Sequence, residues 1–321
     1  MSLRSIVEAG REIPSVGRDF PSEGLGVIHL SHIVKKMGMS PLVYAYPQNP
    51  QGPEEIAIPP DRVIYHYVES GIPVLVGIPT KNSGHAVVVI GHTVSRDAWW
   101  PHASGRYYAE SPTGGPYHCS TAWLQEFLIS DDNLGPYLTV SSRFLRERAE
   151  EGLLLVVPLP KHVFLKAEDA ELYAYKLLQS EKLRQGIERH PKQSSSRFWA
   201  EHFWDHVSRN DIVLRTYLSA GSELKARLLS EDTNGEVTEL ISETPLHDFV
   251  WVTEMSTPGL FAQDRQYLGI TVLDPTDDPR RNECLFLLQH TPGMLICRNA
   301  KSGTTLEYIF DEDHPHPHLV R

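Results

Sequence analysis

Cysteine is scarce in this chain of 321 residues. The three that it has, Cys119, Cys284 and Cys297, are too few and too irregularly spaced for a disulfide framework, so we expect a reduced protein. The segment 1–11 lacks the hydrophobic core of a secretion signal, and no apolar run is long enough to span a bilayer. These absences predict a cytoplasmic protein. A targeting signal upstream of residue 1 would change that expectation.

Positive charge is also in deficit, because 30 Lys and Arg residues face 41 Asp and Glu residues and leave a formal net charge of -11. Proteins that bind nucleic acid present a basic face, and anionic membranes attract basic segments. The composition therefore argues against nucleic-acid and membrane partners. Glycine-rich loops that cradle a phosphate or a dinucleotide are absent as well, so we expect no cofactor.

Two apolar runs rich in β-branched residues lie close together in the first third of the chain. Residues 72–78 and 85–91 each predict a strand, and the polar segment 79–84 between them has the composition of a turn. A connection this short predicts an antiparallel hairpin, since it leaves no room for a crossover helix. Continuous apolar runs are typical of strands that are covered on both faces.

His85 directly follows Gly84 and stands at the entrance of the second strand. An imidazole held at the end of a rigid strand is well placed for proton transfer, although an isolated histidine is more often a structural one. Further on, the apolar strand 127–130 ends at Asp131, Asp132 and Asn133. These three residues could orient the His85 ring, or they could simply cap a turn.

The order of these features resembles the papain-like cysteine peptidases, in particular the bacterial group similar to double-glycine leader peptidases. The resemblance rests on the sequences Gly71-Ile72-Pro73-Val74 and Gly84-His85-Ala86-Val87, on Asp131-Asp132-Asn133 and on residues 17–44, and it covers about the first half of the chain. It implies that His85 is a general base and that Asp131 orients its ring, with Asp132 or Asn133 as substitutes. It also implies a peptide or protein substrate.

One departure from that family leaves two hypotheses open. The family's nucleophile is a cysteine upstream of the histidine, but residues 1–84 contain no cysteine. The chain is then either a cysteine peptidase-like hydrolase whose nucleophile lies upstream of it, or a non-catalytic peptidase fold that serves as a binding or regulatory module. Cys119 lies in the wrong chain order, before an expected helix over 121–126, and we interpret it as an ordinary loop thiol.

Mixed strands and helices predict an α+β protein of two domains. We expect a papain-like domain with an antiparallel sheet over 1–160 and an α/β domain of unassigned role over 161–321, with a long helix over 166–186 near the boundary. His202 and His206 lie four residues apart, and His314, His316 and His318 alternate with prolines. We interpret the first pair as surface or packing residues and the second group as a frayed tail that could bind a metal adventitiously, and we predict no metal site.

The remaining pattern predicts the other elements. Helices are expected over 2–12, 27–37, 61–70 and 221–229, and strands over 42–46, 138–140, 153–159, 212–218, 249–254, 267–273, 284–289, 294–297 and 305–310.

Overall fold

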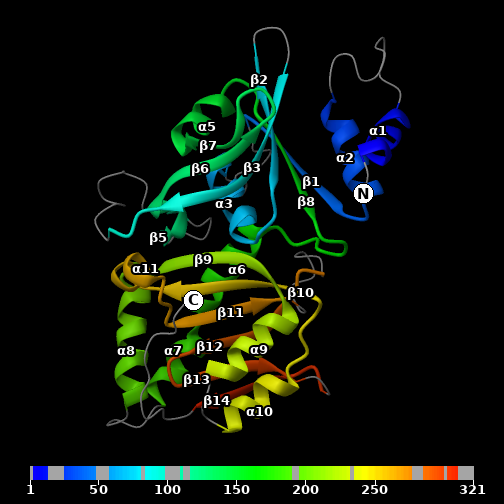
Figure 1. Cartoon of the computed structure of the whole chain (residues 1–321). Helices are drawn as coiled ribbons and strands as arrows, with labels where there is room; N and C mark the ends of the chain where they lie inside the picture. Colours follow the sequence, from blue (N-terminus) through cyan, green and yellow to red (C-terminus); the bar gives the residue numbers. More distant parts are fainter. Residues whose placement is uncertain are drawn as a thin grey trace. The chain divides into compact units, whose positions relative to one another are not determined.

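The computed structural model describes residues 3–13, 25–47, 58–80, 84–97, 109–110, 116–189, 195–231, 235–276, 285–299 and 302–309. The chain forms two compact units, each of which combines helices with a sheet, so the fold is α+β (Figure 1). Unit 1 comprises residues 1–93 and 125–163, and unit 2 comprises residues 94–124 and 164–321. The division therefore has more than the one boundary near residue 160 that the sequence predicts. Residues 94–124 belong to unit 2, although the segments before and after them belong to unit 1.

The sheet of unit 1 contains the predicted hairpin. Its described strands follow the order β1-β8-β2-β3-β6-β7. Strand β2 pairs antiparallel with β3, and the register sets Val74 opposite Val89 and Ile78 opposite His85, which confirms the hairpin. The strands are β1 (Ser40–Ala45), β2 (Val74–Pro79), β3 (Gly84–Val94), β6 (Leu124–Asp131), β7 (Gly135–Ser141) and β8 (Leu154–Leu159).

The two faces of strand β3 are not equally covered. Val87 and Val89 are buried, whereas Ala86 before them and Ile90 after them, on the opposite face, are exposed. The expectation that both faces of this strand are covered is therefore wrong. An apolar residue at every position does not by itself bury both faces, since burial also requires a second layer of structure on each side.

Helix α3 packs against β2, and its sequence explains why the helix could be predicted from local residues. It begins with Pro60 at its first turn, where the missing N–H costs nothing, and it buries Val63, Ile64 and Tyr67. The helices of unit 1 are α1 (Leu3–Arg11), α2 (Val27–Lys36), α3 (Pro60–Glu69) and α5 (Ser142–Ala149). Among all described residues, no helix combines the length and the apolar character needed to cross a membrane.

The sheet of unit 2 has the described strand order β14-β13-β12-β11-β10-β9-β5-β4. Neighbouring strands are antiparallel except β5, which pairs parallel to β9 with His118 opposite Val213. The strands are β4 (Ala109–Glu110), β5 (Pro116–Cys119), β9 (Val213–Ala220), β10 (Phe249–Ser256), β11 (Gly269–Leu273), β12 (Phe286–Thr291), β13 (Met294–Arg298) and β14 (Thr305–Ile309).

Helices cover both faces of this sheet, and each face has its own hydrophobic cluster. One cluster includes Leu178, Leu183 and Phe203 from α6, α7 and α8, and the other includes Leu228 and Ile241 from α9 and α10 (Figure 1). The helical elements are η1 (Ser120–Trp123), α6 (Ala167–Leu178), α7 (Glu181–Glu188), α8 (Ser195–Ser208), α9 (Gly221–Glu231), α10 (Gly235–Glu243) and α11 (Pro258–Asp264).

Two helices expected from the sequence are wrong in extent. The long helix over 166–186 is instead α6 and α7, because the Ser180 side chain accepts a hydrogen bond from the Leu183 N–H and starts a new helix. The helix expected over 121–126 is only the 3₁₀ turn η1, and Leu124 already begins strand β6.

Candidate functional site

His85 and Asp131 come from neighbouring strands of the unit 1 sheet. His85 is the second residue of β3, and Asp131 is the last residue of β6, so the two side chains meet where one strand begins and the other ends. The distance from His85 Nε2 to Asp131 Oδ2 is 2.9 Å. The predicted hydrogen bond between His85 and the 131–133 segment is therefore confirmed, whereas a catalytic role stays a prediction.

Asp131 is buried and accepts several hydrogen bonds. Its Oδ2 atom accepts from His85, and its Oδ1 atom accepts from the backbone N–H groups of Asn133 at 2.8 Å and Leu134 at 3.2 Å. The hydrogen bond from His85 lowers the pKa of Asp131 below its ordinary value, against the opposing effect of burial, and the two backbone N–H groups lower it further. The side chain is a carboxylate at neutral pH.

The partners of the His85 ring select one tautomer. A carboxylate only accepts hydrogen bonds, so Nε2 carries the proton that is donated to Asp131. The Asn133 amide nitrogen lies 3.3 Å from Nδ1 and can only donate, which leaves Nδ1 as the acceptor. The ring is 29% exposed. Nδ1 is therefore the basic atom of this pair, and it belongs to a ring that solvent and ligands can reach.

Asp132 is exposed, and one of its carboxylate oxygens lies within 4.8 Å of ligand atoms of His85 and Asp131. Imidazole and carboxylate groups are also the ligand types of cation sites. However, the 2.9 Å hydrogen bond already joins the nitrogen and oxygen that a metal would use. The geometry favours an imidazole oriented by a carboxylate over a metal centre.

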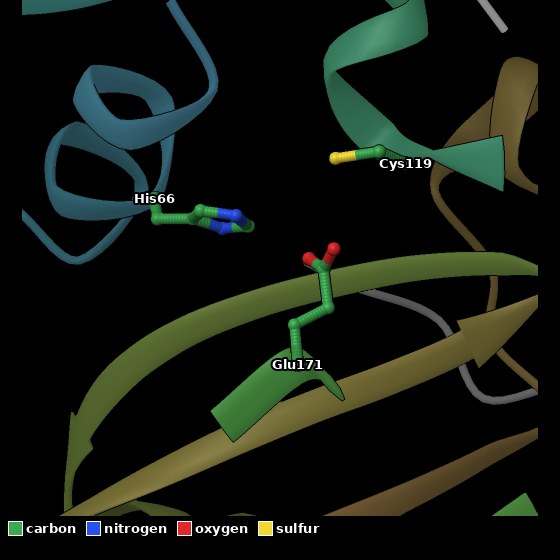
Figure 2. A group of neighbouring side chains, drawn as sticks. All are labelled: His66, Cys119 and Glu171. Atoms are coloured by element: carbon green, nitrogen blue, oxygen red, sulfur yellow. The ribbon is translucent and has the colours of Figure 1, made fainter. Parts of the chain in front are cut away.

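Cys119 lies in unit 2, at the end of β5, and is buried. Its Sγ atom lies within 4.8 Å of a carboxylate oxygen of Glu171 (Figure 2). The Glu171 carboxylate in turn accepts a hydrogen bond from the Tyr117 hydroxyl at 2.8 Å. His66, drawn in the same figure, belongs to unit 1. A carboxylate neighbour opposes the formation of a thiolate, so the unit 2 surroundings of Cys119 are not those of an activated nucleophile.

A second histidine–carboxylate pair in unit 1 was missed by the sequence reasoning. His92 Nε2 lies 2.5 Å from Glu69 Oε1, and the His92 side chain is only 9% exposed. The signal was available, because the dipeptide Gly91-His92 repeats Gly84-His85 seven residues later. His92 is less accessible to a substrate than His85, so His85 remains the better candidate for proton transfer.

Comparisons with known proteins found little. No protein-family model matches the sequence, and no curated protein matches it. One solved structure with some similarity is the peptidase domain of Streptococcus ComA, a bi-functional ABC transporter involved in a quorum sensing pathway. The identity is 13%, the match covers 49% of this chain and 79% of that domain, and the TM-score is 0.27. A TM-score of this size does not establish a shared fold, so the site has to be judged by its own geometry.

Proposed function

We propose that unit 1 is a cysteine peptidase-like domain in which His85 acts as the general base for cleavage or transfer at a peptide or amide bond. The observation that carries the proposal is the hydrogen bond from His85 Nε2 to Asp131. An orienting carboxylate of this kind fixes the tautomer of a catalytic histidine and stabilises the imidazolium that forms when the base takes a proton. Asp131 is then a positioning residue, and Nδ1 of His85 is the atom that takes the proton.

The nucleophile of such a reaction is a thiol, which needs a nearby base to become a thiolate near neutral pH. Residues 1–93 and 125–163, which make up unit 1, contain no cysteine. The proposal therefore assigns the base and its orienting carboxylate to unit 1 and leaves the thiol to a source outside it. Asn133, which approaches the same Nδ1 atom, would have to give way to that thiol.

The absence of cysteine from unit 1 also favours a second candidate function. A domain that retains the histidine and its carboxylate but has no thiol of its own would bind peptides without cleaving them, as a binding or regulatory module. Such a module would use the exposed edge of the His85 ring and the exposed Asn133 amide as hydrogen-bonding groups.

The two functions are separated by supplying the thiol from solution. The rate of thiolysis of an activated ester, p-nitrophenyl acetate, by added 2-mercaptoethanol is measured with the whole chain and with His85→Gln. In a complete active site, a positioned general base raises the rate by a factor of about 10²–10⁴. Because the thiol here is not held by the protein, we expect a smaller effect, and His85→Gln should lower the protein-dependent rate by about tenfold or more. Asp131→Asn should lower it in the same direction, because the tautomer is no longer fixed.

His32→Gln is the matched control in unit 1. His32 also contacts a carboxylate, Glu12, at 2.9 Å, and its side chain is 25% exposed, close to the value for His85. Its loss should leave the rate unchanged. Equal rates for the wild-type chain, His85→Gln and His32→Gln would exclude the general base and leave the binding module.

A further inference from the structure

Two histidines of unit 2, His118 and His206, share one carboxylate, and a third, His202, packs against His206. His202 and His206 lie one turn apart on helix α8, Asp211 lies between α8 and β9, and His118 lies on strand β5. Side chains at positions i and i+4 of a helix share a face, so the two α8 histidines are neighbours by construction. No step of the proposed peptidase chemistry uses any of these residues.

Asp211 links two of the three rings. Its Oδ1 atom accepts from His118 Nε2 at 2.9 Å, and its Oδ2 atom accepts from His206 Nδ1 at 3.2 Å. The backbone carbonyl of Asp211 also accepts from His206 Nδ1 at 3.2 Å. Two acceptors on one nitrogen place the proton of His206 on Nδ1, so the lone pair of Nε2 points away from Asp211. This is the arrangement in which a histidine ligates a metal while a carboxylate holds its other nitrogen.

His202 is held by aromatic packing instead. Its ring stacks on Phe198, with 6.4 Å between centroids and 5° between planes, and meets the edge of Trp199 at 5.7 Å. Within the part of the chain that the structure describes, no hydrogen bond engages either ring nitrogen of His202 or Nε2 of His206. The ring is thus oriented without using up its lone pair.

The two α8 rings stand at a spacing that suits one metal ion. Their centroids are 4.8 Å apart and their planes meet at 78°. When one nitrogen of each ring coordinates the ion along the line from its centroid, metal–nitrogen bonds of about 2.0–2.1 Å put each centroid about 3.2 Å from the metal, and the 4.8 Å spacing then corresponds to a nitrogen–metal–nitrogen angle of about 100°. That angle lies between the octahedral and the tetrahedral values.

We propose that His202 and His206 bind a divalent transition-metal ion of the zinc class, and that Asp211 orients His206 for this purpose. Among the described residues, no third histidine, cysteine, aspartate or glutamate joins both rings in a group whose ligand atoms all lie within 4.8 Å of one another. The remaining coordination positions are therefore filled by water or by a ligand, as in an open metal site. Imidazole ligands favour zinc over magnesium, so Mg²⁺ should not compete.

Zinc binding to the whole chain by isothermal titration calorimetry tests the site. The histidines at 314, 316 and 318 can also bind metal, so all variants carry His314→Ala, His316→Ala and His318→Ala. We expect that His202→Ala and His206→Ala each remove one zinc equivalent. Asp211→Asn should weaken the same site by about 10–100-fold, the usual effect of losing the carboxylate behind a ligating histidine.

His247→Ala is the matched control, because His247 also pairs with an aspartate of unit 2, Asp274, at 2.9 Å. It should leave zinc binding unchanged. Unchanged binding in His202→Ala or His206→Ala would overturn the proposal. The ¹⁵N chemical shifts of the histidine rings, measured by NMR in a chain whose α8 is not mutated, test the site independently. Zinc should shift Nε2 of His206 while Nδ1 keeps its proton, and binding at Nδ1 would contradict the role of Asp211.

Discussion

The imidazole of His85 donates a hydrogen bond of 2.9 Å to the carboxylate of Asp131, 46 residues further along the chain. The same carboxylate accepts two backbone N–H groups from the turn that follows it. The ring and its acceptor are therefore fixed by two neighbouring strands and a turn, so their geometry does not depend on a bound substrate.

The first prediction concerns pH. The pKa of Asp131 in the folded chain lies below its ordinary value of 3.8. As the pH falls, the Asp131 carboxylate is therefore protonated at a higher pH in the unfolded chain than in the folded chain. The stabilising contribution of Asp131 is therefore fully present above the ordinary pKa and is lost as the pH falls through the folded value. The difference in unfolding free energy between the wild type and Asp131→Asn should be constant from about pH 5 to 6 and should shrink below about pH 4.

Urea unfolding at a series of pH values measures this difference. A difference that grows as the pH falls, or that stays constant down to about pH 2, would contradict the lowered pKa.

The second prediction concerns Arg146 on helix α5, which donates two hydrogen bonds of 2.8 Å to the buried carboxylate of Asp61 on α3. Removal of the guanidinium leaves a buried charge without its partner. Hydrogen bonds to charged groups contribute about 1.5–3 kcal/mol, and Arg146 is 44% exposed, so we expect Arg146→Gln to cost about 2 kcal/mol in chemical denaturation.

Arg143→Gln on the same helix is the control. Arg143 is 81% exposed and, among the described residues, pairs only with Glu147 one turn away, so its loss should cost about 0.5 kcal/mol or less. Equal costs for the two variants would show that the Asp61 pair contributes no more than a surface ion pair.

The third prediction compares two glycines that begin helices. A Cβ atom at Gly221, the first residue of α9, would lie 2.0 Å from the backbone carbonyl oxygen of His247, and no side-chain movement relieves that clash. A Cβ atom at Gly235, the first residue of α10, meets no described atom within 4 Å. Gly221→Ala should destabilise unit 2 by about 2 kcal/mol or more, whereas Gly235→Ala should be neutral or stabilise it by about 0.4–1 kcal/mol.

Thermal unfolding followed by circular dichroism measures both variants. A Gly221→Ala chain that unfolds at the wild-type temperature would mean that the loop at His247 moves away easily.

The fourth prediction concerns thiol reactivity. Cys119 and Cys297 are both buried, and burial raises the pKa of the Cys297 thiol. In a Cys284→Ser background, both thiols should react slowly with Ellman's reagent in the folded chain and quickly after unfolding, because the thiolate is the reacting form. Fast labelling of the folded chain that disappears in Cys119→Ser would identify Cys119 as an activated thiol and contradict the interpretation of it as an ordinary one.

The sequence alone determined the local parts of this protein. The hairpin of β2 and β3 followed from two β-branched runs and a polar turn, and α3 followed from its apolar spacing and from Gly71 just after its end. His85 could be singled out because Gly84 and His85 open a strand, and Asp131 because it closes another. Each of these features depends on residues within a few positions of one another, so it can be predicted from the local sequence pattern.

Only the tertiary structure decided which distant segments pair. Residues 116–119 belong to unit 2 because β5 pairs with β9, about a hundred residues later. The four residues of β5 contain no pattern that predicts this pairing. In the same way, Asp211 gives His206 of α8 its orienting carboxylate, and the same carboxylate also accepts a hydrogen bond from His118 of β5. Hydrogen bonds between segments far apart in the sequence depend on which segments the fold brings together. No periodic pattern in the sequence indicates that pairing.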